Sequence, residues 1–216
     1  MPTPFWPKKK PIWSLKVADD AAWPHSARKR LLDLCMSALA LLLLFPILLL
    51  ISLLNFFFMG PPVFFCQSRP GRYGKSFTLI KFRTLYGSEA DTEAPEGKVP
   101  PNRFSAFLRA SGLDEIPELW NILKGDMSFV GPRPLLERYL PRYSPEQARR
   151  HNIRPGLTGL AQVNGRNALD WESRLELDVE YVETATLCGD LRILWKTLTL
   201  IGRGEGTAEP GEFTGK

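Results

Sequence analysis

The chain has 216 residues, and its 28 Lys and Arg against 23 Asp and Glu give a formal net charge of +5. Charged residues make up 24% and hydrophobic residues 44%, ordinary globular values that exclude a disordered or collagen-like chain, and three Cys exclude a disulfide-rich one. Residues 1–33 hold seven basic and three acidic groups, so +4 of the net charge lies there. The rest is nearly balanced, so no nucleic-acid partner is expected.

A long apolar segment follows this basic start. Residues 34–68 contain no Asp, Glu, Lys, Arg or His, and Leu34–Leu54 is long enough for a membrane helix. Pro46 divides the apolar run into arms of 12 residues (34–45) and 13 residues (47–59). Each arm is about 18–20 Å long as a helix, which is shorter than a hydrocarbon core of about 30 Å. Because proline kinks a helix, we expect a re-entrant hairpin, and a kinked spanning helix is the alternative.

Basic side chains flank the apolar run on both sides. They are Arg28, Lys29 and Arg30 before it and Arg69, Arg72 and Lys75 after it. Since basic residues mark the cytoplasmic side of a membrane segment, both ends are predicted to face the cytoplasm, which favours a re-entrant helix over residues 27–60. Residues 1–26 contain three lysines in a row and three tryptophans. They are predicted to form an interfacial segment on the membrane, with a solvated tail as the alternative.

The remainder is predicted to be a small, mostly helical α+β domain over residues 61–201, with a tail at 202–216. The expected elements are a strand over Phe77–Phe82, a loop over residues 86–102, and helices that begin at Asn102, span Asp114–Lys124 and span Ser144–Asn152. Near the end, an apolar stripe has helical spacing; its members are Leu191, Leu194, Trp195, Leu198 and Ile201. Such a stripe usually packs on a core, which is the prediction here, and a membrane-surface role is the alternative. His25 and His151 are expected at the surface.

Two adjacent acidic residues, Asp114 and Glu115, stand at the expected start of a helix. The helix dipole and free backbone N–H groups favour anions there, and a carboxylate can hold a metal ion or attack phosphorus. Arg133 lies between two prolines and Arg154 precedes another, so both guanidinium groups are held in stiff segments that suit phosphate oxygens. These residues together predict a phosphoryl-transfer site beside a membrane.

The sequence around this pair resembles the signature of the bacterial sugar transferases, the monotopic phosphoglycosyl transferases. The segments that carry the resemblance are Lys81–Thr84, Ser111–Pro134, Arg154–Asn167 and Asp178–Tyr181. The chain looks like the small minimal-core type of this family, in which a re-entrant membrane helix is broken at a proline. Phe45 stands where relatives often carry serine before that proline, so a hydroxyl that bonds the freed backbone is missing.

The resemblance implies transfer of a phosphosugar from a UDP-sugar to polyprenyl (undecaprenyl) phosphate, with release of UMP, at the cytoplasmic face of a bacterial inner membrane. It implies that Asp114 is the nucleophile that holds the phosphosugar covalently and also binds Mg²⁺, and that Glu115 is its acid/base neighbour. Arg133 is implied to bind phosphate. Lys81 and Arg154 are candidates for phosphate or nucleotide binding, with structural ion pairing as the alternative for both.

The identity of the donor sugar is the finer prediction. The ending Glu212–Lys216 resembles that of family members that load an acetylated amino sugar, so a UDP-linked N-acetylated amino sugar is the expected donor in a first membrane step of glycoconjugate assembly. A UDP-hexose, glucose or galactose, is the first alternative, and a non-enzymatic membrane scaffold is the second. Arg166 and Asp178 are expected to hold the domain together. The sequence predicts no oligomeric state.

Overall fold

The structure is a computed structural model that describes residues 23–85, 102–165 and 169–202. Its elements, with 3-10 turns written η, are η2 (Trp23–His25), α1 (Ala27–Met59), β1 (Phe64–Pro70), η3 (Arg72–Gly74), β2 (Ser76–Phe82), α2 (Arg103–Ser111), η4 (Leu113–Glu115), α3 (Glu118–Lys124), β3 (Ser128–Val130), η5 (Glu137–Arg142), η6 (Gln147–Asn152), β4 (Gly156–Thr158), α4 (Leu160–Val163), α5 (Trp171–Thr184) and α6 (Leu187–Gly202). This content agrees with a mostly helical α+β chain. The predicted loop at 86–101, most of the segment 1–26 and the tail from residue 203 lie outside the described residues.

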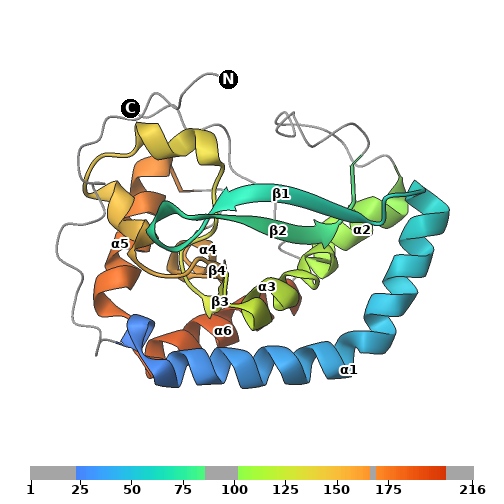
Figure 1. Ribbon diagram of the computed structural model, residues 1–216, viewed down its shortest axis with the longest axis horizontal. Coiled ribbons are helices and arrows are strands. Elements are labelled where there is room, and N and C mark those ends of the chain that lie inside the picture. Colours follow the sequence, from blue (N-terminus) through green and yellow to red (C-terminus); the bar gives the residue numbers. More distant parts are fainter. Residues whose placement is uncertain (1–22, 86–101, 166–168, 203–216) are drawn as a thin grey trace.

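Helix α1 bends near its middle into two arms (Figure 1). Ser26 caps its start by accepting a hydrogen bond from the Lys29 backbone N–H, and Gly60 caps its end. Pro46 lies inside the helix and has no N–H to donate to the carbonyl of the preceding turn. Sharp helix bends usually have such an identifiable cause, and proline supplies it here.

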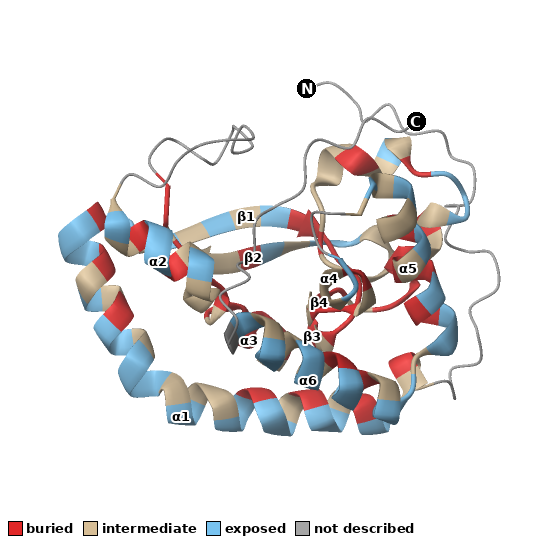
Figure 2. Cartoon of the chain, turned by 180° about the vertical axis from the view of Figure 1, so that it is seen from behind, coloured by how far each residue is buried: buried red, intermediate tan, exposed pale blue. Residues whose placement is uncertain are grey.

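Most of the surface of α1 is apolar and exposed. An 18-residue stretch of α1 has a mean hydropathy of 2.9, and 11% of this stretch is buried. In Figure 2 much of α1 has the pale blue of exposed residues. The exposed side chains include Leu39, Leu42, Leu43, Phe45, Leu50 and Phe57. An apolar surface of this extent is costly in water and favourable in a bilayer, so α1 has the surface expected of a membrane-associated helix.

Both ends of α1 are bonded to the same folded body. At its start, Lys29 Nζ lies 2.5 Å from Asp190 Oδ2 of α6, and both residues are buried. At its end, Arg83 Nη2 donates a hydrogen bond to the Met59 carbonyl at 2.5 Å. Helix α1 therefore begins and ends on one body (Figure 1), and its middle packs against α3 through Ala40, Leu41 and Leu44.

Two small sheets and α3 form the centre of the body. Strands β1 and β2 are antiparallel, and β3 and β4 are parallel. Asn121 of α3 bonds to β2, because its Oδ1 accepts from the Ile80 N–H at 3.1 Å and its Nδ2 donates to the Thr78 carbonyl at 2.7 Å. Leu79 and Ile122 are buried in the same cluster. This packing fixes α3, and with it the acidic pair, against the hairpin.

The apolar stripe of α6 faces outward, so the prediction that it packs on the core is wrong for four of its five members. Leu191, Trp195, Leu198 and Ile201 are 55%, 69%, 64% and 43% exposed, whereas Leu194 packs against core residues. An amphipathic pattern defines an apolar face but does not say what covers it. The alternative, a helix that lies on a membrane surface, fits this exposure.

Two further predictions need correction. The helix expected over Ser144–Asn152 is the 3-10 segment η6, which begins at Gln147. His151 is not a surface residue but is 4% exposed, with its ring 5.6 Å from that of Tyr143. Burial and the neighbouring Arg150 lower the pKa of His151 to about 3, so its imidazole is neutral.

Candidate active site

The acidic pair lies in the 3-10 turn η4 rather than inside a helix. Gly112 ends α2 in the left-handed conformation, with φ 70°, and turns the chain directly into η4. Pro117 then precedes the first residue of α3, so the helix expected from Asp114 begins at Glu118 instead. Asp114 and Glu115 are 6% and 7% exposed. The turn therefore holds two carboxylates in a largely water-excluded position.

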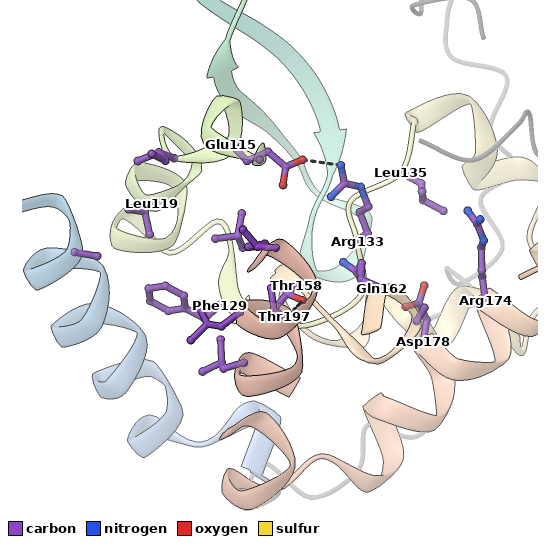
Figure 3. Close-up of a pocket in the computed structure, with 18 of the residues that line it drawn as sticks. Glu115, Leu119, Phe129, Arg133, Leu135, Thr158, Gln162, Arg174, Asp178 and Thr197 are labelled. Atoms are coloured by element: carbon purple, nitrogen blue, oxygen red, sulfur yellow. Dashed lines mark hydrogen bonds and ion pairs between the residues drawn. The ribbon is translucent and has the colours of Figure 1, made fainter. Parts of the chain in front are cut away.

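Glu115 is paired with two cationic side chains from distant parts of the chain. Its Oε1 accepts hydrogen bonds from Lys81 Nζ of β2 and from Arg133 Nη2, both at 2.8 Å, and Figure 3 shows the second contact. Lys81 Nζ also lies 3.3 Å from Glu118 Oε1. The predicted residues Glu115, Lys81 and Arg133 are thus brought together beside Asp114.

The two adjacent carboxylates have opposite pKa shifts. Burial and the charge of Glu115 raise the pKa of Asp114 to about 6. Burial alone would also raise the pKa of Glu115, but the charges and hydrogen bonds of Arg133 and Lys81 outweigh it and hold that pKa well below its ordinary value. Asp114 is therefore ionised only above weakly acidic pH, while Glu115 stays ionised. This favours Glu115 as an electrostatic partner of Arg133, and its predicted acid/base role stays a prediction.

Glu118 is a third carboxylate of the site, and the sequence did not predict it as a site residue. Burial raises its pKa to about 7, with Lys81 opposing the shift and Glu115 adding to it. Glu118 follows Asp114 by four positions and Glu115 by three, a spacing that places side chains on one face of a helix. This spacing is the signal that would have found it.

The residues present fit a Mg²⁺ ion that is shared with substrate. Within the described part of the chain, no group of three His, Cys, Asp or Glu side chains is arranged to hold a metal ion. The buried Oδ1 of Asp114 has no hydrogen-bond partner in the structure. Because Mg²⁺ commonly takes one or two carboxylates together with substrate phosphates and water, Asp114 suits this ion when a diphosphate is bound.

The backbone of Arg133 is held by a buried ion pair between two other residues. Arg150 Nη2 donates to the Arg133 carbonyl at 2.7 Å and to Asp178 Oδ2 at 2.7 Å. Asp178 thus has the structural role predicted for it. The strand pair β3–β4 before the loop is tightly packed, because a Cβ on Gly156 would lie 2.1 Å from the Gly131 backbone nitrogen. The loop that carries Arg133 is therefore fixed on both sides.

A cavity of about 510 Å³ opens beside Glu115 and Arg133. Its apolar wall includes Met36, Ala40 and Leu44 of α1, Leu119 of α3, Phe129 of β3, and Leu194 and Leu198 of α6. Its polar wall includes Glu115, Arg133, Gln162, Arg174 and Asp178 (Figure 3). The cavity thus joins the arm of α1 that carries an exposed apolar surface to the charged groups of the site.

Arg154 is not brought to this site. It lies at the opposite end of α3 from the acidic pair, where its Nε donates to the Gly125 carbonyl at 2.9 Å, and it does not line the cavity. Arg30 is beside it, donating to the carbonyls of Ile122 and Leu123 at 2.6 and 2.8 Å. Arg154 therefore contacts a helix C-terminus, and its predicted role with phosphate has no geometric support. Arg166 lies outside the described residues.

Comparison with known proteins gives a consistent result. A family model described as bacterial sugar transferase matches residues 24–204. The uncharacterized sugar transferase EpsL of Bacillus subtilis is 47% identical over 160 residues, which cover 72% of this chain and 77% of EpsL. The UDP-glucose:undecaprenyl-phosphate glucose-1-phosphate transferase of Caulobacter vibrioides is 40% identical over 182 residues, 79% of this chain and 68% of that relative. The undecaprenyl-phosphate galactose phosphotransferase of Salmonella typhimurium is 37% identical over 165 residues, 68% of this chain and 35% of that longer relative.

The match covers α1, the acidic pair, the Arg133 loop and all of α6. It therefore includes both the apolar helix and every residue of the paired site described above. The chain belongs to the bacterial sugar transferase family and is, as the sequence predicted, a phosphoglycosyl transferase.

Proposed function

We propose that the protein transfers a hexose phosphate from a UDP-hexose to a polyprenyl phosphate, which gives a polyprenyl diphosphate hexose and UMP. Four relatives have names that specify a sugar, and the sugar is glucose or galactose in each name. They support the hexose alternative over the N-acetylated amino sugar that the C-terminal residues suggested. The ending that suggested an amino sugar, Glu212–Lys216, lies outside the described residues.

The chemistry proceeds in two balanced steps. In the first, a carboxylate oxygen of Asp114 attacks the phosphorus that carries the sugar, the bond from that phosphorus to the bridging oxygen breaks, and its electron pair leaves with UMP. In the second, an oxygen of the polyprenyl phosphate attacks the same phosphorus, and the bond to Asp114 breaks to restore the carboxylate. The unpartnered Oδ1 of Asp114 supports this role, because no hydrogen bond must be broken before attack.

The cations beside Asp114 supply electrostatic stabilisation. Arg133 is positioned to bind the non-bridging oxygens of the reacting phosphate, where negative charge is concentrated during transfer. Glu115 orients Arg133 and Lys81 through the two contacts of 2.8 Å. Mg²⁺, when bound through Asp114, adds positive charge at the diphosphate.

The single observation that carries the proposal is the cavity in which an apolar wall from α1 and α6 meets Glu115 and Arg133. A polyprenyl phosphate has this division in one molecule: its apolar chain suits the wall formed by Met36, Leu44 and Leu198, and its phosphate suits Arg133. Few water-soluble acceptor substrates would bind against such an apolar wall.

Membrane topology is part of the proposal. The contacts of both ends of α1 with one body support a re-entrant helix, because a spanning helix has its ends on opposite faces of the bilayer. The exposed stripe of α6 supports a second contact with the membrane surface. The basic residues at both flanks of the apolar run support a catalytic body on the cytoplasmic face.

A donor panel tests the proposal. UMP release is measured in the presence of polyprenyl phosphate and Mg²⁺ with UDP-glucose, UDP-galactose and UDP-N-acetylglucosamine. We expect turnover with a hexose donor, none without polyprenyl phosphate after the first equivalent, and none in Asp114→Asn. Asp170→Asn, an exposed position at the start of α5, is the matched control. Full turnover by Asp114→Asn would contradict the proposal, and preference for the acetylated donor would restore the amino-sugar reading.

A further inference from the structure

Gln162 of α4 lines the cavity, and the chemistry above assigns it no role. Its amide nitrogen and oxygen are both buried, and neither has a hydrogen-bond partner in the structure. Its neighbours differ: the hydroxyls of Thr158 and Thr197 lie 2.7 Å apart and bond to each other. Among the described residues that line the cavity, Gln162 alone has buried side-chain polar atoms without a partner.

The amide oxygen of Gln162 lies close to the backbone of Gly159. A Cβ on Gly159 would lie 2.6 Å from Gln162 Oε1, so the amide oxygen packs where any other residue would place a side chain. The NH₂ end carries two donors, and because neither amide atom is accessible in the structure, a ligand bonds to this end after the side chain rotates toward the cavity. Gln162 and Arg133 both line the polar wall of the cavity (Figure 3).

An unpartnered buried amide is costly, and native proteins rarely keep one without a reason. A ligand oxygen that accepts a hydrogen bond removes that cost. Glu115 and Asp178 are already bonded to Arg133 and Arg150, so these four charged groups are engaged in ion pairs. The amide of Gln162 differs from them because it carries no charge. It is a neutral donor, which suits a hydroxyl oxygen better than a second cation would.

The geometry of phosphoryl transfer indicates which part of the donor this amide meets. In an in-line displacement the attacking and leaving oxygens occupy the two apical positions, so the leaving UMP lies opposite Asp114. The sugar oxygen shares the equatorial plane with the non-bridging oxygens that Arg133 is proposed to bind. A polar side chain on the cavity wall that carries Arg133, such as Gln162, is therefore expected next to the sugar rather than next to the leaving nucleotide.

We propose that Gln162 forms a sugar subsite, in which its amide donates a hydrogen bond to a ring hydroxyl of the donor hexose. The residue then acts in specificity rather than in bond breaking. This inference rests on the proposed function, because it requires that a UDP-hexose occupies the cavity.

The test crosses a Gln162 variant with donors that lack one hydroxyl. kcat/KM for UMP release is measured for the parent and for Gln162→Met with UDP-glucose and with its 2-, 3-, 4- and 6-deoxy analogues. Methionine keeps the unbranched shape and removes the amide. In the parent, we expect loss of the bonded hydroxyl to lower kcat/KM about tenfold. In Gln162→Met that penalty disappears, while the penalties at the other three positions remain.

Controls separate this role from a structural one. Gln147→Met, the same replacement in η6 and outside the cavity, is expected to keep all four penalties of the parent. If Gln162→Met fails to fold, Gln162→Asn keeps the polarity but shortens the side chain, and the same penalty should disappear.

Three results would overturn the inference. One is that all four penalties are equal in the variant and the parent, and another is that the parent has no penalty. The third is an equal loss with every donor together with weaker inhibition by UMP, which would assign Gln162 to the nucleotide. A parent that releases no UMP from any UDP-hexose would instead contradict the proposed function itself.

Discussion

The Oε1 atom of Glu115 lies 2.8 Å from the Nη2 atom of Arg133, which joins the turn η4 to the loop after β3. The two residues are 18 positions apart in the chain. Arg150 also holds the Arg133 backbone through its carbonyl, while Glu115 holds the guanidinium. An arginine that is fixed before substrate binds stabilises developing charge without reorganisation, which is the basis of electrostatic catalysis.

Replacement of Arg133 should therefore reduce catalysis strongly. In Arg133→Met, we expect kcat/KM for UMP release to fall by about 10²- to 10³-fold, the range found when one charge-stabilising donor is removed. Glu115 also loses its strongest counter-charge, so its pKa should rise. Arg192→Met, at an exposed position of α6, is the control and should keep the parent rate. A loss of less than threefold in Arg133→Met would contradict the role assigned to this residue.

The raised pKa of Asp114 predicts the acid limb of the pH profile. Since the attacking group is the carboxylate and its pKa is about 6, the rate of UMP release in a single turnover should be constant above pH 7. Below about pH 6 it should fall roughly tenfold for each pH unit. Circular dichroism at each pH shows whether the fold persists. A rate that stays constant down to pH 4.5 would mean that Asp114 is not the titrating nucleophile.

The same pKa predicts that Asp114 costs stability. Because its folded pKa, about 6, lies above the ordinary aspartate value of 3.8, the folded state binds the proton more tightly. The contribution of Asp114 to stability is then greatest below pH 4 and is lost as the pH rises through 6. Asp114→Asn should raise Tm by several degrees at pH 8 and change it little at pH 4. Asp170→Asn keeps a helix-capping side chain and should leave Tm nearly unchanged at both values. Equal Tm shifts for Asp114→Asn at the two pH values would refute this prediction.

The re-entrant arrangement predicts where the flanks of α1 are accessible. The native cysteines, Cys35, Cys66 and Cys188, are exposed and are first replaced by serine. Arg28→Cys and Lys75→Cys, both at exposed positions, should then resist an impermeant maleimide in spheroplasts and react in inverted vesicles. A spanning helix would place the two positions on opposite faces, so reaction of Arg28→Cys in spheroplasts would exclude the hairpin.

The parts of the fold that follow from local sequence were predictable. The apolar run with Pro46 at its centre gave a bent helix, because the loss of one backbone donor acts within a single turn. The closeness of Glu115 and Arg133 also followed, since both lie in one contiguous signature that resembles the family. Lys81 lies with them because the bonds of Asn121 to β2 hold α3 and the acidic pair against that strand.

Other features depend on tertiary packing, which a local pattern does not contain. Arg154 precedes a proline as Arg133 does, yet Arg133 follows β3 whereas Arg154 precedes the parallel strand β4. The two arginines therefore lie at opposite ends of this strand pair, and Arg154 meets the C-terminus of α3. His151 is buried because η6 packs against α5 and η3, and neither contact has a local signal. The stripe that includes Trp195 revealed a face of a helix but not that it is left uncovered.

The most direct test of the central claim is the mass of the intact protein after incubation with UDP-glucose or UDP-galactose and Mg²⁺ in the absence of acceptor. The account predicts an added hexose phosphate on the parent protein, its location on Asp114, its absence from Asp114→Asn, and its loss when polyprenyl phosphate is added. A parent that transfers sugar phosphate to the acceptor without ever carrying this mass, or an Asp114→Asn protein that carries it, would contradict the account.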